Sequence, residues 1–451
     1  MARMFGTDGI RGTANVAPVS PETVMALGRA AVHVLAPTGS GVKPSLVVGH
    51  DPRLSSPMLA AALTAGMCAA GADVFAVGVL PTPGVAYLIR HLGAVGGAVI
   101  SASHNPYMDN GIKFFSRTGS KLDDALEEAI EARIGGTDTG QPLTGAAIGR
   151  PILSEGSIQY YVDFLRRAFR YETPVNLRVG LDCAHGAASA IAPVLFRQLG
   201  AGVHVWHAAP NGLNINAQCG AVYPEFLQQK VLEEKLDVGF AFDGDADRLI
   251  AIDHTGRVLD GDYLLAVCAQ AFLGETQPSQ RIVVSTVMAN LSLEQALGQM
   301  GIALHRTPVG DKYVVEGMRQ TGAVLGGEQS GHIVFLNHHT TGDGLLTAVQ
   351  LLNAMAARQL PLAVLAQVLH KLPQIVLNVK IRERRAPLGL LQVQQMVEEA
   401  ESVLGNDGRV VVRLSGTEPV ARVMVEGPDQ DIIEPLAHRI GQAITNELGL
   451  S

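Results

Sequence analysis

The chain has 451 residues, of which 47% are hydrophobic and 17% charged, and its formal net charge is -8. This length exceeds what one small core needs, so we expect three or four compact units. The negative charge argues against a general nucleic-acid binder, which normally carries a basic surface. A small anionic substrate is still open, because local Arg and Lys clusters set the field in a pocket.

The four cysteines lie far apart and form no CxxC pair, so the sequence predicts neither a disulfide framework nor a zinc knuckle. The opening MARMFGTDGIRG lacks the apolar stretch of a secretory signal. The most apolar stretch, 61 to 80, is broken by Asp73 and several glycines and is predicted as helix, turn and strand rather than a membrane span. We therefore expect a cytoplasmic protein with reduced thiols and no membrane contact.

Short β-rich runs alternate with helical runs, as in a strand at 45–49, a helix at 57–70 and a strand at 72–79. This alternation favours parallel sheets with crossover helices. It recurs over 177–253 and 281–335, whereas the chain from Ile375 onward is typical of a smaller α+β module. The predicted fold is α/β, with three tandem mixed α/β domains and a C-terminal α+β domain around a central cleft. The predicted domain ranges are 1–154, 155–254, 255–372 and 373–451.

The first candidate site is ISASHNPYMDNGIKFF, which follows the apolar run GAVISA. Ser103 is predicted just past the end of a strand, on a tight and exposed polar turn. Ligands of open α/β sheets bind at the carboxyl ends of the strands. Lys113 would add a positive charge near the same loop. Taken alone, the pattern fits an ordinary turn capped by Asn105 equally well.

The second candidate site is DGDADR, in which Asp243, Asp245 and Asp247 alternate and Arg248 follows. Carboxylates at this spacing point to one side, where a cation would offset their repulsion. Oxygen ligands without His or Cys favour magnesium over zinc. An EF-hand is excluded, because Arg248 and His254 stand where its loop needs Gly and Glu. The alternative to a metal site is an acidic turn exposed to solvent. The apolar runs on both sides argue against that alternative, because they place the loop at the end of a buried strand.

The third candidate site is GGEQSGH, a glycine-flanked loop that allows close backbone approach. Glu328 and Ser330 have the groups that read sugar hydroxyls by hydrogen bonds, and His332 can transfer a proton near neutral pH. Taken alone, a glycine-rich sequence of this kind more often forms a turn that binds no ligand.

The fourth candidate site is RLSGTEPVAR, a predicted turn between the last two strands. Arg413, the hydroxyls of Ser415 and Thr417, and the backbone around Gly416 together suit a phosphate group. No GK[ST] phosphate loop is present in the sequence, so ATP is not implied.

The five motifs FGTDGIRG, SASHNP, DGDADR, GEQSGH and RLSGTEP appear in the order seen in the α-D-phosphohexomutase superfamily. The chain resembles this superfamily over nearly its whole length, and within it most resembles the bacterial phosphoglucosamine mutase branch. The resemblance implies four domains around one cleft, a hexosamine phosphate substrate, Mg²⁺ as cofactor and a homodimer. It implies that phospho-Ser103 and a bisphosphorylated intermediate interconvert glucosamine 6-phosphate and glucosamine 1-phosphate, feeding amino-sugar nucleotide and cell-wall precursor synthesis.

The resemblance also implies roles for residues in all four candidate sites. The metal ligands would be Ser103 through its phosphate, Asp243, Asp245 and Asp247. The groups around the phosphoserine would be Arg11, His104, Lys113 and Arg248. For the mechanism we add a hypothesis of our own, that Lys113 or His332 is the general base, and the sequence does not decide between them. The substrate-binding residues would be Thr307, Gly310, Asp311, Lys312, Glu328, Ser330, Arg413, Ser415, Gly416, Thr417 and Arg422.

Three other functions compete with this one. A phosphomannomutase or phosphoglucomutase would share every motif and differ in the sugar. A sugar-phosphate phosphatase would use Ser103 but would need no second phosphate-binding loop. A non-catalytic sugar-phosphate sensor could dispense with Ser103 or with one of the aspartates, and all of them are present.

Overall fold

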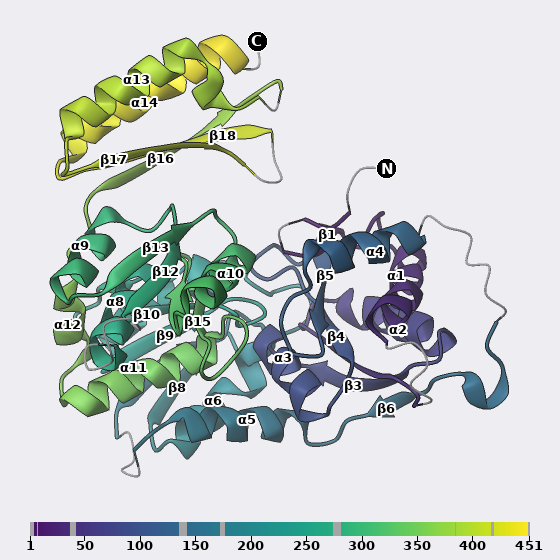
Figure 1. Ribbon diagram of the computed structural model, residues 1–451. Helices are drawn as coiled ribbons and strands as arrows, with labels where there is room; N and C mark the ends of the chain where they lie inside the picture. The colour runs from purple at the N-terminus through teal and green to yellow at the C-terminus, as the bar shows by residue number, and fades with distance from the viewer. Residues whose placement is uncertain are drawn as a thin grey trace.

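The computed structural model describes residues 4–6, 8–36, 42–134, 142–171, 176–273, 281–383, 385–415 and 419–449. Within these ranges the chain forms four β-sheets, one after another along the sequence. Helices accompany every sheet, and the smallest sheet, nearest the C-terminus, stands apart from the other three (Figure 1). The predicted succession of three α/β units and a C-terminal α+β unit is therefore confirmed.

The first sheet has six strands in the order β1-β5-β4-β2-β3-β6. Strand β2 is parallel to β3 and β4, and β3 is parallel to β6, whereas β5 is antiparallel to both β4 and β1. The strands are β1 (Ile10–Thr13), β2 (Ser45–His50), β3 (Asp73–Val79), β4 (Gly96–Ile100), β5 (Asp109–Ser116) and β6 (Pro151–Leu153). The helices are α1 (Pro21–Leu35), α2 (Ser56–Ala69), α3 (Thr82–His91) and α4 (Asp124–Ile134).

Both faces of this first sheet are covered. In β2, Leu46 and Val48 join a core with α1 and α2, while Val47 between them joins the core that contains α3. Successive side chains of a strand point to opposite faces, so the helices lie on both sides of the sheet. Strand β4 is buried along its whole length, as its apolar sequence requires.

The second sheet has the order β11-β10-β9-β7-β8, and the third has the order β13-β12-β14-β15. The second contains β7 (Arg178–Asp182), β8 (Gly202–Trp206), β9 (Val238–Phe242), β10 (Leu249–Asp253) and β11 (Val258–Leu259), with α5 (Ser157–Ala168), α6 (Ala192–Gln198) and α7 (Glu225–Glu233).

The third sheet contains β12 (Ile282–Thr286), β13 (Ala303–Thr307), β14 (Leu325–Gly327) and β15 (Ile333–Phe335). Its neighbouring helices are α8 (Gly261–Phe272), α9 (Leu291–Gln299), α10 (Asp311–Thr321), α11 (Gly344–Arg358) and α12 (Leu362–Leu365).

The fourth sheet is antiparallel, in the order β16-β18-β17, and two long helices cover one of its faces (Figure 1). Its elements are β16 (Gln374–Lys380), β17 (Arg409–Leu414), β18 (Val420–Glu426), α13 (Leu391–Leu404) and α14 (Gln430–Leu448). Short 3₁₀ turns lie at Gly145–Ala147, Ala187–Ala190, Gly220–Val222, Ala366–Val368 and Pro387–Gly389.

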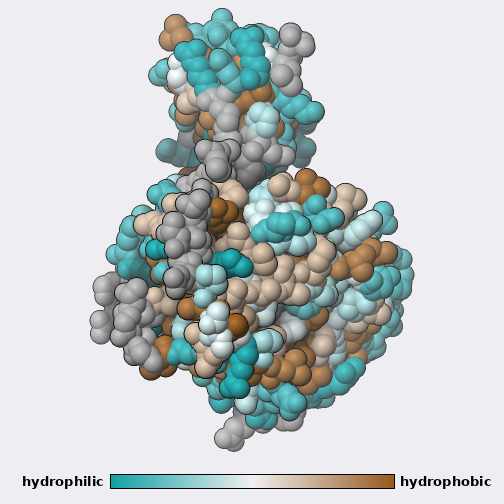
Figure 2. Space-filling view, turned by 90° about the vertical axis from the view of Figure 1, so that its right-hand side faces the viewer, coloured by the Kyte–Doolittle hydropathy of each residue, from teal (hydrophilic) through white to brown (hydrophobic). Residues whose placement is uncertain are grey.

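The hydrophobic cores show how the four units are connected. One core contains Val47 of the first sheet, Leu181 of the second and Val283 of the third, so these units are packed against one another. The fourth unit has a core of its own, formed by residues between Ile381 and Leu448. It stands above the larger body in Figure 2, and polar side chains cover much of its visible face.

None of the described helices alone has both the length and the apolar composition that crossing a membrane needs. One pair, Gly344–Arg358 with Leu362–Val368, passes on length and composition, with a bend of 89° between its parts.

Candidate active site

Ser103 lies three residues beyond the end of β4, as predicted, on a turn with a left-handed backbone (φ 53°). Its Oγ donates a hydrogen bond of 2.6 Å to Asp243 Oδ2, and its backbone N–H donates one of 2.9 Å to Ser101 Oγ. The prediction that this turn is exposed is wrong, because Ser103 is only 1% exposed. The loop of the second unit covers it so closely that a Cβ on Gly244 would lie 2.6 Å from Ser103 O.

The three aspartates of DGDADR form one buried cluster between β9 and β10. One carboxylate oxygen from each lies within 4.8 Å of the others, and none of the three residues is more than 3% exposed. A solvated acidic turn is therefore ruled out. Burial, together with Asp247 and Asp245, raises the pKa of Asp243 well above its usual range.

Two oxygens of this cluster, Asp245 Oδ1 and Asp247 Oδ1, have no hydrogen-bond partner in the described part of the chain. A buried carboxylate oxygen without a partner lowers the stability of the folded protein unless a cation or a hydrogen-bond donor binds it. The cluster consists of hard oxygen ligands, so its residues fit a divalent metal ion.

Lys113 lies on β5 and is buried among carboxylates. Its Nζ is 3.0 Å from Asp245 Oδ2, 3.2 Å from Asp247 Oδ2 and 3.2 Å from Asp8 Oδ2. Burial opposes the charge, yet Asp245, Asp8 and Asp247 raise the pKa of Lys113 well above its usual value. Lys113 is thus an ammonium ion in this arrangement, as a neutralising group must be.

Asp8 and Lys121 belong to the same network but were missed in the sequence. Asp8 pairs with Arg11, Lys113 and Lys121, and Lys121 also pairs with Asp311 of the third unit. Asp8 lies inside the FGTDGIRG motif, which could have drawn attention to it. No local sequence pattern identifies Lys121, because its contacts come from two units: Asp8 of the first and Asp311 of the third.

Three other predicted groups gather around Ser103. His104 Nδ1 is 3.5 Å from Ser103 Oγ, and burial together with Arg248 and Arg11 lowers the pKa of His104 to about 4. Arg11 donates to Asn105 Oδ1 at 3.3 Å. The Arg248 guanidinium lies 3.8 Å from Asp247 Oδ1. A neutral imidazole therefore lies next to the hydroxyl, and two guanidinium groups lie close enough to that imidazole to lower its pKa.

The third unit brings His332 and Glu328 to the same region. His332 Nδ1 is 3.7 Å from Asp247 Oδ2, and its Nε2 is 3.4 Å from Asp311 Oδ2. Burial opposes protonation, but Asp247 and Asp311 raise the pKa of His332. Glu328 Oε1 accepts from the backbone N–H of Gly310 at 3.1 Å, and burial raises the pKa of this carboxyl group.

The other predicted residues of the third unit occupy the same loops. Ser330 Oγ is buried without a hydrogen-bond partner among the described residues. Thr307 ends β13, and its Oγ1 donates to Pro308 O at 3.0 Å. Lys312, near the start of α10, donates to Asp124 Oδ1 of the first unit at 2.6 Å. The substrate loop predicted at 307–312 therefore contacts both the sugar-recognition loop and the first unit.

In the fourth unit, Arg413 and Arg422 lie directly opposite each other on β17 and β18. Burial and Arg422 lower the pKa of Arg413, whereas the charge of Glu328 raises it. Like charges opposite each other in a sheet are destabilising unless an anion joins them. The backbone N–H of Ser415, directly after β17, donates to Val420 O of β18 at 2.8 Å. Gly416 and Thr417 lie outside the described residues.

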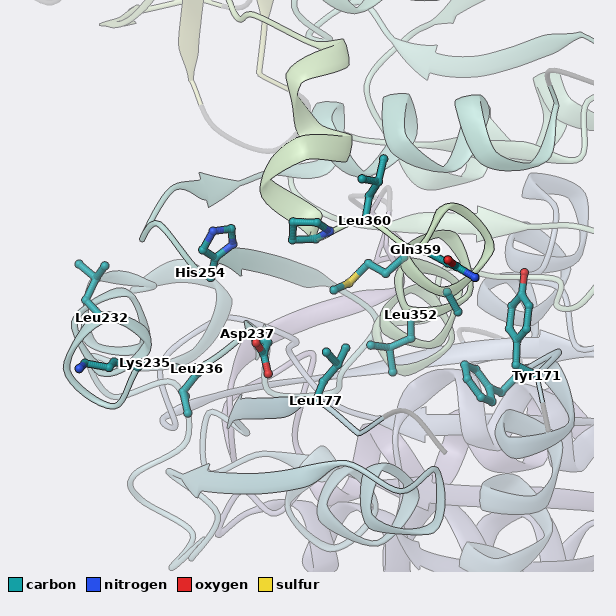
Figure 3. Close-up of a pocket in the computed structure, with 14 residues that line it drawn as sticks. Tyr171, Leu177, Leu232, Lys235, Leu236, Asp237, His254, Leu352, Gln359 and Leu360 are labelled. Atoms are coloured by element: carbon teal, nitrogen blue, oxygen red, sulfur yellow. The ribbon is translucent and has the colours of Figure 1, made fainter. Parts of the chain in front are cut away.

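A cavity of ≈ 820 Å³ lies elsewhere, at the ends of β7, α7, β10 and α11 (Figure 3). Leu177, Leu236, Leu352 and Met355 contribute to its largely apolar wall. None of the predicted site residues is among the described residues that line it. The candidate active site is therefore the polar cluster around Ser103.

The chain is similar in sequence to known protein families and to named proteins. Four phosphoglucomutase/phosphomannomutase domains match: α/β/α domains I, II and III at residues 2–141, 159–256 and 260–372, and the C-terminal domain at 376–443. Phosphoglucosamine mutase of Symbiobacterium thermophilum is 48% identical over 450 residues, covering 99% of this chain and 100% of that protein. Phosphoglucosamine mutase of Desulforamulus reducens is 45% identical over 446 residues, covering 98% and 100%.

Solved structures share the fold. A phosphoglucomutase/phosphomannomutase family protein from Burkholderia thailandensis has a TM-score of 0.81 at 24% identity, with 99% of each chain covered. N-acetylphosphoglucosamine mutase of Aspergillus fumigatus, in complex with GlcNAc-6P and magnesium, has a TM-score of 0.66 at 18% identity, covering 98% of this chain and 95% of that one. The domain matches and the full-length relatives show that the chain belongs to the phosphoglucomutase/phosphomannomutase family of the α-D-phosphohexomutase superfamily.

Proposed function

We propose that the protein interconverts glucosamine 6-phosphate and glucosamine 1-phosphate, with Ser103 as the residue that carries the phosphoryl group. The observation that carries this proposal is the 2.6 Å contact of Ser103 Oγ with Asp243 inside a buried set of carboxylates and cations. The relatives that are 45% and 48% identical over almost the full chain are phosphoglucosamine mutases, which supports the choice of sugar.

Asp243, Asp245 and Asp247 are the residues that would hold Mg²⁺, with an oxygen of the Ser103 phosphate as a further ligand. Bound there, the ion would offset negative charge on the transferring phosphoryl group. The two unpartnered carboxylate oxygens and the absence of His or Cys from this set favour a hard ion. Lys113, Arg11 and Arg248 would add fixed positive charge around the same oxygens.

The reaction has two transfers. In the first, a free sugar hydroxyl attacks phospho-Ser103, the bond from phosphorus to Ser103 Oγ breaks, and a bisphosphorylated sugar forms. After this sugar turns round, Ser103 Oγ attacks its other phosphate and the product leaves. A base takes the proton of each attacking hydroxyl and returns it to each leaving oxygen. His332 and Lys113 are the two candidates for this base. The pKa of Lys113 is raised well above its usual value, so this residue keeps its proton and is a poor acceptor, which favours His332.

The remaining predicted residues would bind the sugar and its second phosphate. Glu328 and Ser330 would read the hydroxyls, alongside the substrate loop at 307–312. Arg413, Ser415, Gly416, Thr417 and Arg422 would bind the phosphate that is not being transferred. This second site distinguishes a mutase from a phosphatase, because only a mutase must retain the bisphosphorylated intermediate.

The test is a coupled assay with the purified, Mg²⁺-loaded protein and three substrates: glucosamine, glucose and mannose 6-phosphate. We expect kcat/KM for the glucosamine compound to exceed the other two by about tenfold or more, a difference of at least roughly 1.4 kcal/mol in transition-state binding. Equal or higher values for glucose or mannose would assign the chain to the phosphoglucomutase or phosphomannomutase reaction instead.

We also infer four functional domains with the ranges 1–154, 155–254, 255–372 and 373–451, a cytoplasmic location and a homodimer. The four separate sheets and the four matched family domains support a fourfold division. Limited proteolysis and sedimentation of the purified protein test the boundaries and the assembly.

A further inference from the structure

We propose that Asn216 and Arg53 are positioning residues that clamp the Ser103 turn from two domains and so direct Ser103 Oγ at the acidic cluster. The inference rests on the proposed role of Ser103 as the phosphoryl carrier. Neither residue belongs to the candidate motifs of the sequence. The clamp acts on two backbone carbonyls, those of Ser103 and Asn105.

Arg53 forms the side of the clamp in the first unit. It is completely buried, and its Nη2 donates to Ser103 O at 2.8 Å and to Asn105 O at 2.9 Å. Its Nη1 donates to Asp109 O at 3.1 Å and its Nε to Asp51 Oδ2 at 2.8 Å. A buried guanidinium with so many partners is fixed in place, since leaving any donor unpaired is costly.

Asp51 ties this guanidinium to the start of the turn. Its Oδ2 also accepts from Ser101 Oγ at 2.7 Å, and the same Ser101 Oγ accepts the backbone N–H of Ser103 at 2.9 Å. The turn is therefore held at its amide as well as at its carbonyls. Asp51 is itself completely buried.

Asn216 forms the opposite side and comes from the second unit, on the long connection that follows β8. Its Nδ2 donates to Ser103 O at 2.8 Å and to Asn105 O at 3.1 Å, the same two oxygens that Arg53 binds. Its own backbone is left-handed (φ 59°), and its N–H donates to Ala184 O at 2.9 Å. The position of the side chain is thus set by the second unit.

This geometry explains how Ser103 keeps a backbone conformation that non-glycine residues rarely adopt. A left-handed φ costs about 1 kcal/mol or more and persists where surrounding contacts impose it. Four hydrogen bonds to two carbonyls hold the backbone while Ser103 Oγ contacts Asp243. The metal loop is part of the same packing, because a Cβ on Gly244 would lie 2.8 Å from Asn216 Nδ2.

The test compares Asn216→Ala with Asn214→Ala, a control on the same loop whose side-chain bonds stay within residues 209–214. We expect Asn216→Ala to lower kcat by about 10- to 100-fold, since small displacements of a reacting group cost this much. KM for the sugar phosphate should stay within about twofold, because Asn216 lies outside the proposed sugar and phosphate sites. Asn216→Asp, which offers no donor to the two carbonyls, should be at least as slow.

A second readout separates positioning from partial unfolding. Dephosphorylated protein is incubated with glucose 1,6-bisphosphate, and phosphate on Ser103 is followed by mass spectrometry. Asn216→Ala should reach the same final extent as wild type, but at a rate lowered by the same factor as kcat. A reduced extent at a normal rate would indicate a smaller folded fraction and would overturn the proposal, as would wild-type kinetics.

Arg53→Lys extends the test to the first unit. A lysine keeps the charge but cannot span the carbonyls of Ser103, Asn105 and Asp109, so the same slow, complete phosphorylation is expected. If this variant does not fold, the Asn216 series still decides the matter. The results distinguish the two proposals. If Ser103→Ala is active, the carrier role of Ser103 is wrong. If Ser103→Ala is inactive but Asn216→Ala has normal kinetics, only the clamp is wrong.

Discussion

Ser103 Oγ and Asp243 Oδ2 are 2.6 Å apart, although 140 residues separate them in the chain. One comes from the end of β4 in the first sheet and the other from the end of β9 in the second. A hydroxyl held against a buried carboxylate cluster is suited to receive a phosphoryl group if cations offset the charge. Lys113, Arg11 and Arg248 supply part of that charge, and the unpartnered carboxylate oxygens leave room for a metal ion.

Asp245→Asn should weaken metal binding. The change removes one negative charge from the proposed ligand set, so the Mg²⁺ concentration for half-maximal activity should rise at least about tenfold. A Mg²⁺ titration of activity, paired with calorimetric titration of the protein alone, measures this. Asp163→Asn, on the surface of α5, is the control, and an unchanged titration for Asp245→Asn would contradict the assignment of the cluster.

Lys113→Met should destabilise the protein most when metal is absent. Removing this buried ammonium takes one positive charge away from three carboxylates, Asp8, Asp245 and Asp247, which costs about 3 to 5 kcal/mol in the free energy of unfolding. Denaturant unfolding in a chelator should show this loss, and saturating Mg²⁺ should reduce it. The surface pair of Lys230 with Glu233 provides the control, because a solvent-screened ion pair contributes little and Lys230→Met should leave the free energy of unfolding nearly unchanged. Equal losses with and without metal would show that Lys113 and the ion do not share one cluster.

Arg413→Lys should raise KM for the sugar phosphate about tenfold or more, because the planar donors that suit a phosphate are lost while the charge remains. Arg413→Met should raise it further. Steady-state kinetics with glucosamine 6-phosphate measure both variants, with Arg439→Met on the exposed face of α14 as the control. A normal KM for Arg413→Met would remove this residue from the phosphate site.

His339 gives the protein a specific sensitivity to acid. Its Nε2 donates to Pro83 O of the first unit at 2.8 Å, and its Nδ1 accepts from Thr340 at 2.8 Å, so the ring is neutral. Burial, together with Arg90, lowers the pKa of His339 from 6.5 to about 4. Between these two values the unfolded state binds a proton that the folded state excludes, so the free energy of unfolding falls as pH falls.

His339→Gln should make the free energy of unfolding less dependent on pH, by up to roughly 1.4 kcal/mol per pH unit in the middle of this window, because glutamine can still donate to Pro83 O but binds no proton. Denaturant unfolding at several values of pH from 6.5 to 4 measures the slope. The exposed His254→Gln is the matched control. Identical slopes for wild type and His339→Gln would show that His339 contributes nothing to the acid response.

The sequence predicts most strands and helices of the site because their apolar patterns are local. The strand before Ser103 and the two strands around Asp243 are examples, and both loops lie where the pattern puts them. Burial of Ser103 could not be predicted in the same way, since the residues that cover it belong to another unit. Lys121 and Asn216 were missed for the same reason: each acts across a contact between units, and no periodicity within one segment reports such contacts.

The most direct test of the account follows one phosphate through Ser103. Protein charged with ³²P-labelled glucosamine 1,6-bisphosphate should carry the label on the Ser103 peptide, and unlabelled glucosamine 6-phosphate should remove it at least as fast as kcat. Ser103→Ala should take up no label and show no turnover, with its fold retained. Label on another residue, or release from Ser103 more slowly than turnover, would contradict the role of this serine as the carrier.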